Sequence, residues 1–124
     1  MKPSEIVAID AKRNKENTSF EDNVNALKAM IAAGAQVLKE GDTLFAFLSH
    51  KERSVEIHSF NAAPTNIFIE NIKKFLELLK KLGAKEAWTE FDNPKLGNVL
   101  KQLEPDFKVK FTKNKRYMAK VSLS

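Results

Sequence analysis

The chain has 124 residues, of which 43% are hydrophobic, and this suits a single domain with its own core. It contains no cysteine and only two histidines, which excludes disulfides, thiolate nucleophiles and Cys-ligated metals and argues against a His-rich metal site. No apolar run approaches the roughly 18 residues of a membrane span, and the N-terminus lacks the apolar stretch of a secretory signal. We therefore expect a soluble protein, made in a cytoplasm, without a metal.

The net charge of +5 is unevenly distributed along the chain. Residues 1–62 hold eight Lys/Arg and nine Asp/Glu, a net of −1, whereas residues 63–124 hold thirteen and seven, a net of +6. Excess positive charge favours contact with phosphates or acidic protein surfaces. A solvated, lysine-rich surface without a partner has the same composition.

The first 19 residues are the most polar, and we separate them from one predicted domain over residues 20–124. A helix is predicted over about 20–33, because Ser19 and Asp22 have the spacing of an N-cap and apolar residues follow at helical intervals. Gly34 is a natural stop for this helix.

A hairpin is predicted next. After a short strand at 36–39, the compact apolar run 43–49 and the alternating run 54–60 are joined by the polar loop 50–53. Alternation divides the second long strand into two faces, one with Val55, Ile57 and Ser59, the other with Glu56, His58 and Phe60.

The clearest helix is predicted over about 66–82, where Gly83 follows as a C-terminal left-handed residue. Its apolar stripe consists of Phe68, Ile72, Phe75, Leu76, Leu79 and Leu82.

The remaining third reads as a strand, a helix and a closing hairpin. The strand spans 84–91, the helix begins at Pro94 and ends before Pro105, and the hairpin strands span 107–111 and 117–123. Strands joined through helices pair in parallel, and hairpins pair antiparallel. The chain therefore predicts an α/β fold with a mixed sheet of about five to seven strands, a central parallel pair, antiparallel flanks and about three helices.

This element order resembles the GNAT (Gcn5-related N-acetyltransferase) fold over residues 19–123. The resemblance implies that SVEIHSF is the central strand and that NAAPTN with the following helix is the acetyl-CoA loop and helix. It further implies that AKEAWTEF is the splayed partner strand and DNPKLGNVLKQL the helix that closes the active site.

The cofactor loop departs from the family's pattern. The family carries Arg/Gln-x-x-Gly-x-Gly/Ala, whose glycines let backbone N–H groups approach a pyrophosphate. The matching stretch 61–66 holds no glycine and no basic residue, and Pro64 lacks an N–H group. No cofactor is therefore expected. If acetyl-CoA does bind, the resemblance implies that the backbone N–H groups of Asn66, Ile67 and Phe68 hold the pyrophosphate.

The catalytic positions also depart from the pattern. Asn93 matches the Asn of the closing helix, but Leu100 stands where the family often has a proton-donating Tyr. Tyr117 lies too far along the chain to replace it. Glu56 and His58 are the candidate bases if the protein is active. In the alternative, Glu56 is a salt-bridged carboxylate and His58 a hydrogen-bonded imidazole, both with structural roles only. No catalytic residue is then expected.

Short GNAT-like proteins with degraded cofactor loops occur in bacteriophages, among them internal virion proteins of short-tailed phages, and this chain has a similar spacing. The resemblance implies a catalytically degenerate protein with a structural or interaction role, located in a virion or the host cytoplasm, with virion components as partners. The alternative is an acetyl-CoA-dependent N-acetyltransferase with a divergent loop.

A third reading is a basic nucleic-acid-binding module, in which the closing hairpin contacts DNA. Its cations alternate with aromatic residues, a pattern that fits backbone contacts with base stacking. The alternative places the aromatic residues in the core and the lysines in water. Trp88 has two readings: it borders a ligand cleft, or, as we expect, it packs between a strand and a helix. The predicted basic surface consists of Lys108, Lys110, Lys113, Lys115, Arg116 and Lys120.

Overall fold

The computed structural model describes residues 1–14, 19–91, 94–103, 108–111 and 116–123. Its α-helices are α1 (Pro3–Arg13), α2 (Phe20–Ala32), α3 (Thr65–Lys81) and α4 (Pro94–Leu103). A 3-10 turn, η1, spans Lys51–Arg53. The strands are β1 (Gln36–Glu40), β2 (Thr43–Ser49), β3 (Ser54–Asn61), β4 (Glu86–Phe91), β5 (Lys108–Phe111) and β6 (Tyr117–Ser122).

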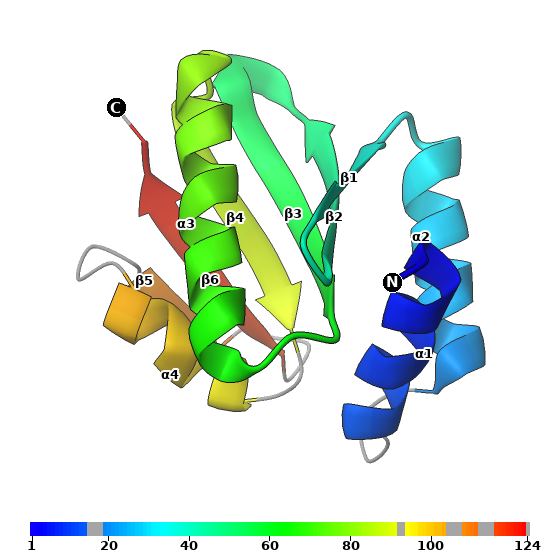
Figure 1. Cartoon of the computed structure of the whole chain (residues 1–124). Coiled ribbons are helices and arrows are strands. Elements are labelled where there is room, and N and C mark those ends of the chain that lie inside the picture. The colour runs from blue at the N-terminus through cyan, green and yellow to red at the C-terminus, as the bar shows by residue number, and fades with distance from the viewer. Residues whose placement is uncertain (15–18, 92–93, 104–107, 112–115, 124) are drawn as a thin grey trace.

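The strands form a six-stranded sheet in the order β1-β2-β3-β4-β6-β5. The β3–β4 pair is parallel, and the other four pairs are antiparallel. In Figure 1, α3 and α4 lie on one side of this sheet and α1 and α2 on the other. The predicted mixed sheet with a central parallel pair is confirmed, and the structure adds α1 as a further helix. Within the described residues, none of the helices combines the length and apolarity that crossing a bilayer requires.

The larger core lies between the sheet and the helix pair α3–α4. Phe45 of β2 stacks on Phe75 of α3, with ring centroids 4.2 Å apart and planes 3° from parallel. Both rings are 1% exposed, so this pair joins the long helix to the middle of the sheet. The apolar stripe predicted for α3 faces this core, apart from Leu82, which is exposed beyond the end of the helix. Gly83 ends α3 as predicted, with φ at +91°.

The second core lies on the opposite face, beneath α1 and α2. Ile6 and Val7 of α1 are buried against Leu44 of β2 and Phe60 of β3. The polar N-terminal segment therefore contains a helix whose apolar side packs on the sheet. The predicted cap of α2 is confirmed, because the Ser19 hydroxyl accepts from the Asp22 amide at 3.1 Å.

Candidate functional site

The parallel strands β3 and β4 pair over a short distance and then part. Their register covers Ser54 with Glu86, Val55 with Ala87, and Glu56 with Trp88, and it ends there. The strands themselves continue to Asn61 and Phe91. The sheet therefore opens beyond the Glu56–Trp88 rung.

A small apolar cavity of about 40 Å³ lies at this opening, on the side of α3 and α4. Side chains from both separated strands and from both helices surround it. Its lining includes Ile57, Ser59, Thr89, Ile72, Leu96 and Leu100.

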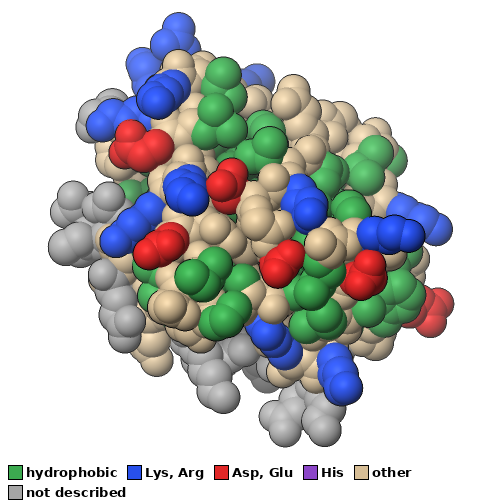
Figure 2. Space-filling model, in the orientation of Figure 1, with side chains coloured by type: hydrophobic (Ala, Val, Ile, Leu, Met, Phe, Trp, Pro, Cys, Tyr) green, Lys and Arg blue, Asp and Glu red, His purple; other side chains and the backbone are tan. Residues whose placement is uncertain are grey.

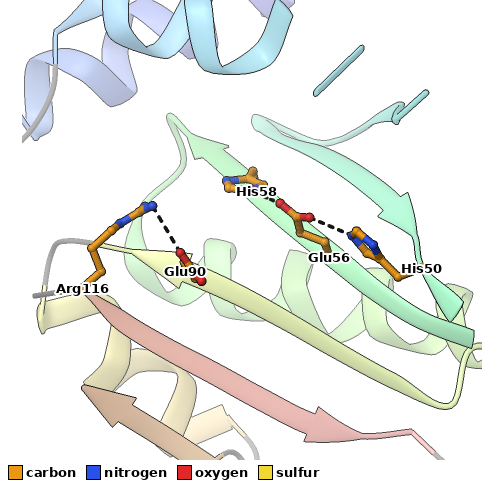
Figure 3. Close-up of polar contacts among 5 residues, drawn as sticks. All are labelled: His50, Glu56, His58, Glu90 and Arg116. Atoms are coloured by element: carbon orange, nitrogen blue, oxygen red, sulfur yellow. Dashed lines mark hydrogen bonds and ion pairs between the residues drawn. The ribbon is translucent and has the colours of Figure 1, made fainter. Parts of the chain in front are cut away.

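Three polar side chains meet on the opposite face of the same opening (Figure 3). Glu56 accepts hydrogen bonds from two imidazoles, His50 Nε2 at 2.9 Å and His58 Nε2 at 2.8 Å. Glu56 and His58 come from β3 and share a face, as alternation predicts, while His50 comes from the turn before η1. The remaining ring nitrogen, Nδ1, of each neutral imidazole is then left as an acceptor.

The pKa of Glu56 is held below its ordinary value. Partial burial would raise this pKa, but hydrogen bonds from His58 and His50, together with their positive charge when protonated, outweigh the burial. Glu56 is therefore a carboxylate at neutral pH and a weak base. Its arrangement suits it to orient the imidazoles.

Trp88 borders this cluster on β4. Its ring centroid lies 5.6 Å from that of His50. Its neighbour Ala87 belongs to the α3 core, so Trp88 projects from the other face of the sheet. Of the two sequence-based readings, the one in which Trp88 borders a cleft fits the structure, because Trp88 is among the residues that line the cavity and its ring lies beside the histidine cluster.

The loop between β3 and α3 is held by internal hydrogen bonds. The Ala62 amide donates to the Asp42 carbonyl at 2.9 Å, and the Ala63 amide donates to Asn61 Oδ1 at 3.1 Å. Arg13 of α1 donates to the carbonyls of Ala63 and Ala62 at 2.7 and 2.9 Å. The backbone donors of this loop are therefore already used within the protein.

Asp10 of α1 anchors the same loop. One of its carboxylate oxygens accepts from the Asn61 amide at 3.0 Å, and the other from Asn23 Nδ2 at 3.0 Å. Burial raises the pKa of Asp10, although these hydrogen bonds and the charge of Arg13 oppose the rise.

One of the three predicted cofactor-binding amides already has an acceptor within α3. The Phe68 amide donates to the Pro64 carbonyl at 2.9 Å, as the first hydrogen bond of α3, and the Phe68 side chain is in the core. The amides of Thr65, Asn66 and Ile67 come before this first helical hydrogen bond, so they have no acceptor within α3. The Phe68 amide is therefore less available to a pyrophosphate than the amides of Asn66 and Ile67, and the role of all three stays a prediction.

The closing helix presents no proton donor at its predicted position. Leu100 is 4% exposed and belongs to the core. Tyr117 stacks on Phe91 at 5.5 Å, away from the histidine cluster's strand β3. Asn93 lies outside the described residues.

The predicted basic surface is described in part. Arg116 pairs with Glu90 at 3.4 Å, and Lys120 pairs with Glu86 at 2.9 Å. Lys108 is exposed on β5. Lys113 and Lys115 lie outside the described residues, and only the backbone of Lys110 is described. Across the described part of the chain, no group of three or more His, Asp or Glu side chains is arranged to hold a metal ion.

The contacts of Arg13 and His50 were not predicted from the sequence. Arg13 lies in the polar first 19 residues, for which no helix is predicted, whereas the structure places it at the end of α1. His50 reads as a hairpin-loop residue, and its place immediately before the turn, close to the strand that carries Glu56, is the one signal that could have singled it out.

No protein-family model matches the sequence, and neither does any curated protein sequence. Solved structures do resemble the fold. A chimera of spermidine N-acetyltransferase SpeG from Vibrio cholerae and hSSAT has a TM-score of 0.60 at 12% identity, with 97% of this chain and 90% of that chain covered. An acetyltransferase from Bacillus subtilis in complex with CoA has a TM-score of 0.54 at 13% identity, with coverages of 81% and 84%.

A domain from Methanocaldococcus jannaschii has a TM-score of 0.53 at 17% identity. The match covers 69% of this chain but 62% of that one, so this chain spans less than two thirds of its length. The two acetyltransferase likenesses extend over most of this chain and show a shared fold. The chain has a GNAT-like fold.

Proposed function

We propose that this domain transfers a small acyl group from an acyl-coenzyme A to an amine. The observation that carries the proposal is the opening of β3 and β4 directly beside an imidazole that a carboxylate orients. The likeness to N-acetyltransferases supports the same reading. The proposal departs from the expectation of a degenerate site, and the contact of Glu56 with His58 at 2.8 Å beside the opening supports it.

The two faces of the opening would have different roles, one holding the acyl group and the other accepting the proton of the amine. The cavity of about 40 Å³ is apolar and has room for a small acyl group only. When bound, the acyl-coenzyme A supplies a thioester whose carbonyl carbon an amine can attack. The C–N bond forms, the C–S bond breaks, and the electron pair leaves with the sulfur.

His58 is the residue we assign to the amine's proton. It lies on the part of β3 beyond the last paired rung, and its Nδ1 is available because Nε2–H donates to Glu56. Glu56 acts as a positioning residue that holds the tautomer. Leu100 has no proton to donate, so the leaving thiolate would take its proton from water.

The surface that would contact the phosphates of the cofactor offers few available hydrogen-bond donors. The amides of Asn66 and Ile67 at the start of α3 can face a phosphate, and Arg13 supplies a cation on the preceding loop. The amides of Ala62 and Ala63 are already bonded. We therefore expect weaker binding than a glycine-rich loop would allow.

A calorimetric titration of acetyl-CoA tests this function, followed by acetyl transfer to a panel of primary amines. The unmodified protein should bind and transfer, and Ser59→Phe, which fills the cavity, should do neither. His58→Ala should keep binding and lose about 10²- to 10⁴-fold in rate, the usual contribution of a general base. No binding at millimolar acetyl-CoA, with the fold intact by circular dichroism, would overturn the proposal.

The internal bonding of the 61–64 loop favours a second candidate function. A loop whose amides bond to Asp42 and Asn61 suits a scaffold that has no pyrophosphate to hold. In that case the domain serves a structural or interaction role, and its proposed setting is a phage particle or the host cytoplasm, with virion components as partners. Mass spectrometry of purified particles tests this directly. A protein absent from particles that also turns over acetyl-CoA would exclude it.

A further inference from the structure

A broad groove of about 1050 Å³ lies where η1, β4, β5 and β6 meet. It has no part in the acyl transfer proposed above. Glu86 and Lys120 project into it from the same face of the sheet as Trp88, because alternate residues of a strand share a face and Lys120 is the register partner of Trp88. Its charged lining consists of Glu52, Arg53, Lys85, Glu86, Lys108 and Lys120.

The groove carries an excess of positive charge. Glu86 is engaged by Lys120 at 2.9 Å. Within the described part of the chain, the side-chain cations of Arg53, Lys85 and Lys108 have no carboxylate partner, and Lys85 and Lys108 are exposed. Unpaired cations gathered along one groove attract a ligand with several negative charges.

Two features of the groove are unfavourable for folding and fit a binding role. Lys108 and Lys120 are direct register partners on β5 and β6, and like charges directly opposite each other destabilise a sheet. Glu52 and Arg53 both have positive φ, at 62° and 59°, a conformation that non-glycine residues rarely adopt. Such strain gathers where a side chain must be presented to a ligand.

The α3 side of the molecule offers a contrast. Figure 2 shows basic and acidic side chains distributed side by side over the face on which α3 lies. Lys74 of α3, for example, pairs with Glu40 at 3.9 Å. That face has the mixed charge of an ordinary solvated surface, so the lysine-rich composition alone does not explain the groove.

An aromatic ring stands in line with the groove's cations. Trp88 is the register partner of Lys120, and Lys120 is the register partner of Lys108. One row across three strands thus carries a half-buried indole followed by two lysines. A flat ring beside a row of cations is the arrangement that stacks an unpaired base while holding the phosphates of its strand.

We propose that this groove binds single-stranded nucleic acid, with Trp88 stacking on a base and with Arg53, Lys85, Lys108 and Lys120 contacting phosphates. A double helix fits less well, because its bases are already stacked on one another and do not present a face to the indole. The inference does not rest on acyl transfer, because the cations of the groove lie outside the cavity and His58 is not used, although Trp88 is also one of the residues that line the cavity.

Trp88 is the single tryptophan of the chain and therefore a direct probe of the groove. Titration with an oligothymidylate should quench its fluorescence, and the affinity should fall steeply with salt. Lys85→Ala with Lys108→Ala should weaken binding at least tenfold at low salt and reduce the salt slope by about 1.4, at about 0.7 for each lost phosphate contact on a single strand. This pair leaves the strained turn and the Lys120–Glu86 contact unchanged.

The matched control is Lys73→Ala with Lys81→Ala, which removes the same charge from exposed positions on α3 and should leave the affinity unchanged. Trp88→Phe, measured by anisotropy of a labelled oligonucleotide, should weaken binding less than Trp88→Ala, because phenylalanine keeps a stacking face. Equal losses in the two lysine pairs would overturn the proposal. So would absent quenching, equal competition by poly-glutamate, or preference for a duplex of the same length.

Discussion

Glu56 of β3 and Trp88 of β4 are register partners on the last rung that these two parallel strands share. Beyond this rung the strands separate, which opens the apolar cavity on the α3 side. On the other side, the same rung carries the carboxylate of the histidine cluster and the indole beside the basic groove. One feature of the sheet therefore positions both the proposed transfer site and the proposed nucleic-acid site.

Replacing Glu56 should change how stability depends on pH. Its pKa is lowered in the folded protein, so the carboxylate stabilises the fold above the unfolded value of about 4.5 and loses this effect as pH falls through the folded pKa. Glu56→Gln should therefore cost about 1 kcal/mol near pH 7, a typical net value for such hydrogen bonds, and nothing below the folded pKa. Urea unfolding across this range measures the difference. Glu77→Gln, on the exposed side of α3, is the control, and a cost for Glu56→Gln that is constant with pH would contradict the account.

The effect of Asp10 on the pH dependence of stability should be opposite to that of Glu56. Its pKa is raised by burial, so the folded state binds a proton more tightly than the unfolded chain, and stability falls as pH rises from about 3.8 through the folded pKa. Asp10→Asn keeps an acceptor oxygen for the Asn61 amide but never ionises. Relative to the unmodified protein, this variant should gain stability over that window. Unfolding free energies of both proteins, measured at matched pH values, test this. If the variant becomes less stable relative to the unmodified protein as pH rises, the predicted direction is wrong.

Arg13→Ala should loosen the loop before α3. The change removes two hydrogen bonds from a guanidinium to the carbonyls of Ala62 and Ala63, and bonds with a charged partner typically contribute about 1.5–3 kcal/mol when removed. Because Arg13 is partly in water, we expect the lower end of this range by urea unfolding. Lys12→Ala, the exposed neighbour, should have little effect. Similar losses for both variants would mean that α1 helicity, and not the loop contact, is responsible.

Thr43→Val tests the buried polar chain beneath the same loop. The fully buried Thr43 hydroxyl bonds to Asn61 Oδ1 at 2.8 Å and accepts from Asn71 Nδ2 at 3.0 Å. Valine keeps the shape and removes both bonds, which leaves the 4%-exposed Asn71 without this partner. We expect a loss of about 1–3 kcal/mol in unfolding free energy. Thr65→Val, at the exposed start of α3, is the control, and the double change with Asn71→Leu should recover part of the loss.

Phe75→Ala should remove the main contact between α3 and the sheet. Phe75 stacks on Phe45 and meets Phe47 edge-on at 5.3 Å. A buried phenylalanine replaced by alanine typically costs about 3–5 kcal/mol. Thermal and urea unfolding should both report this loss. Phe20→Ala removes a ring of the same size that is 49% exposed and should cost far less; comparable costs would indicate that the core is not where the structure places it.

Local patterns determined most of the fold. Period-two alternation predicted which residues of β3 share a face, and so placed Glu56 with His58 before any tertiary contact was considered. Helical periodicity with Gly83 predicted α3 to within a residue at each end. These predictions succeed because they depend on side-chain direction and backbone preference within one element, and neighbouring elements do not change them.

Tertiary structure alone decided where the two proposed sites lie. The opening after the Glu56–Trp88 rung depends on where two strands far apart in the chain stop pairing. The contact of Arg13 with Ala63 spans 50 residues, and the groove joins η1 to three strands. Composition shows the positive charge of the second half but not that Arg53, from the first half, joins it. No local pattern encodes such contacts, because they arise from the packing of elements that are distant in sequence.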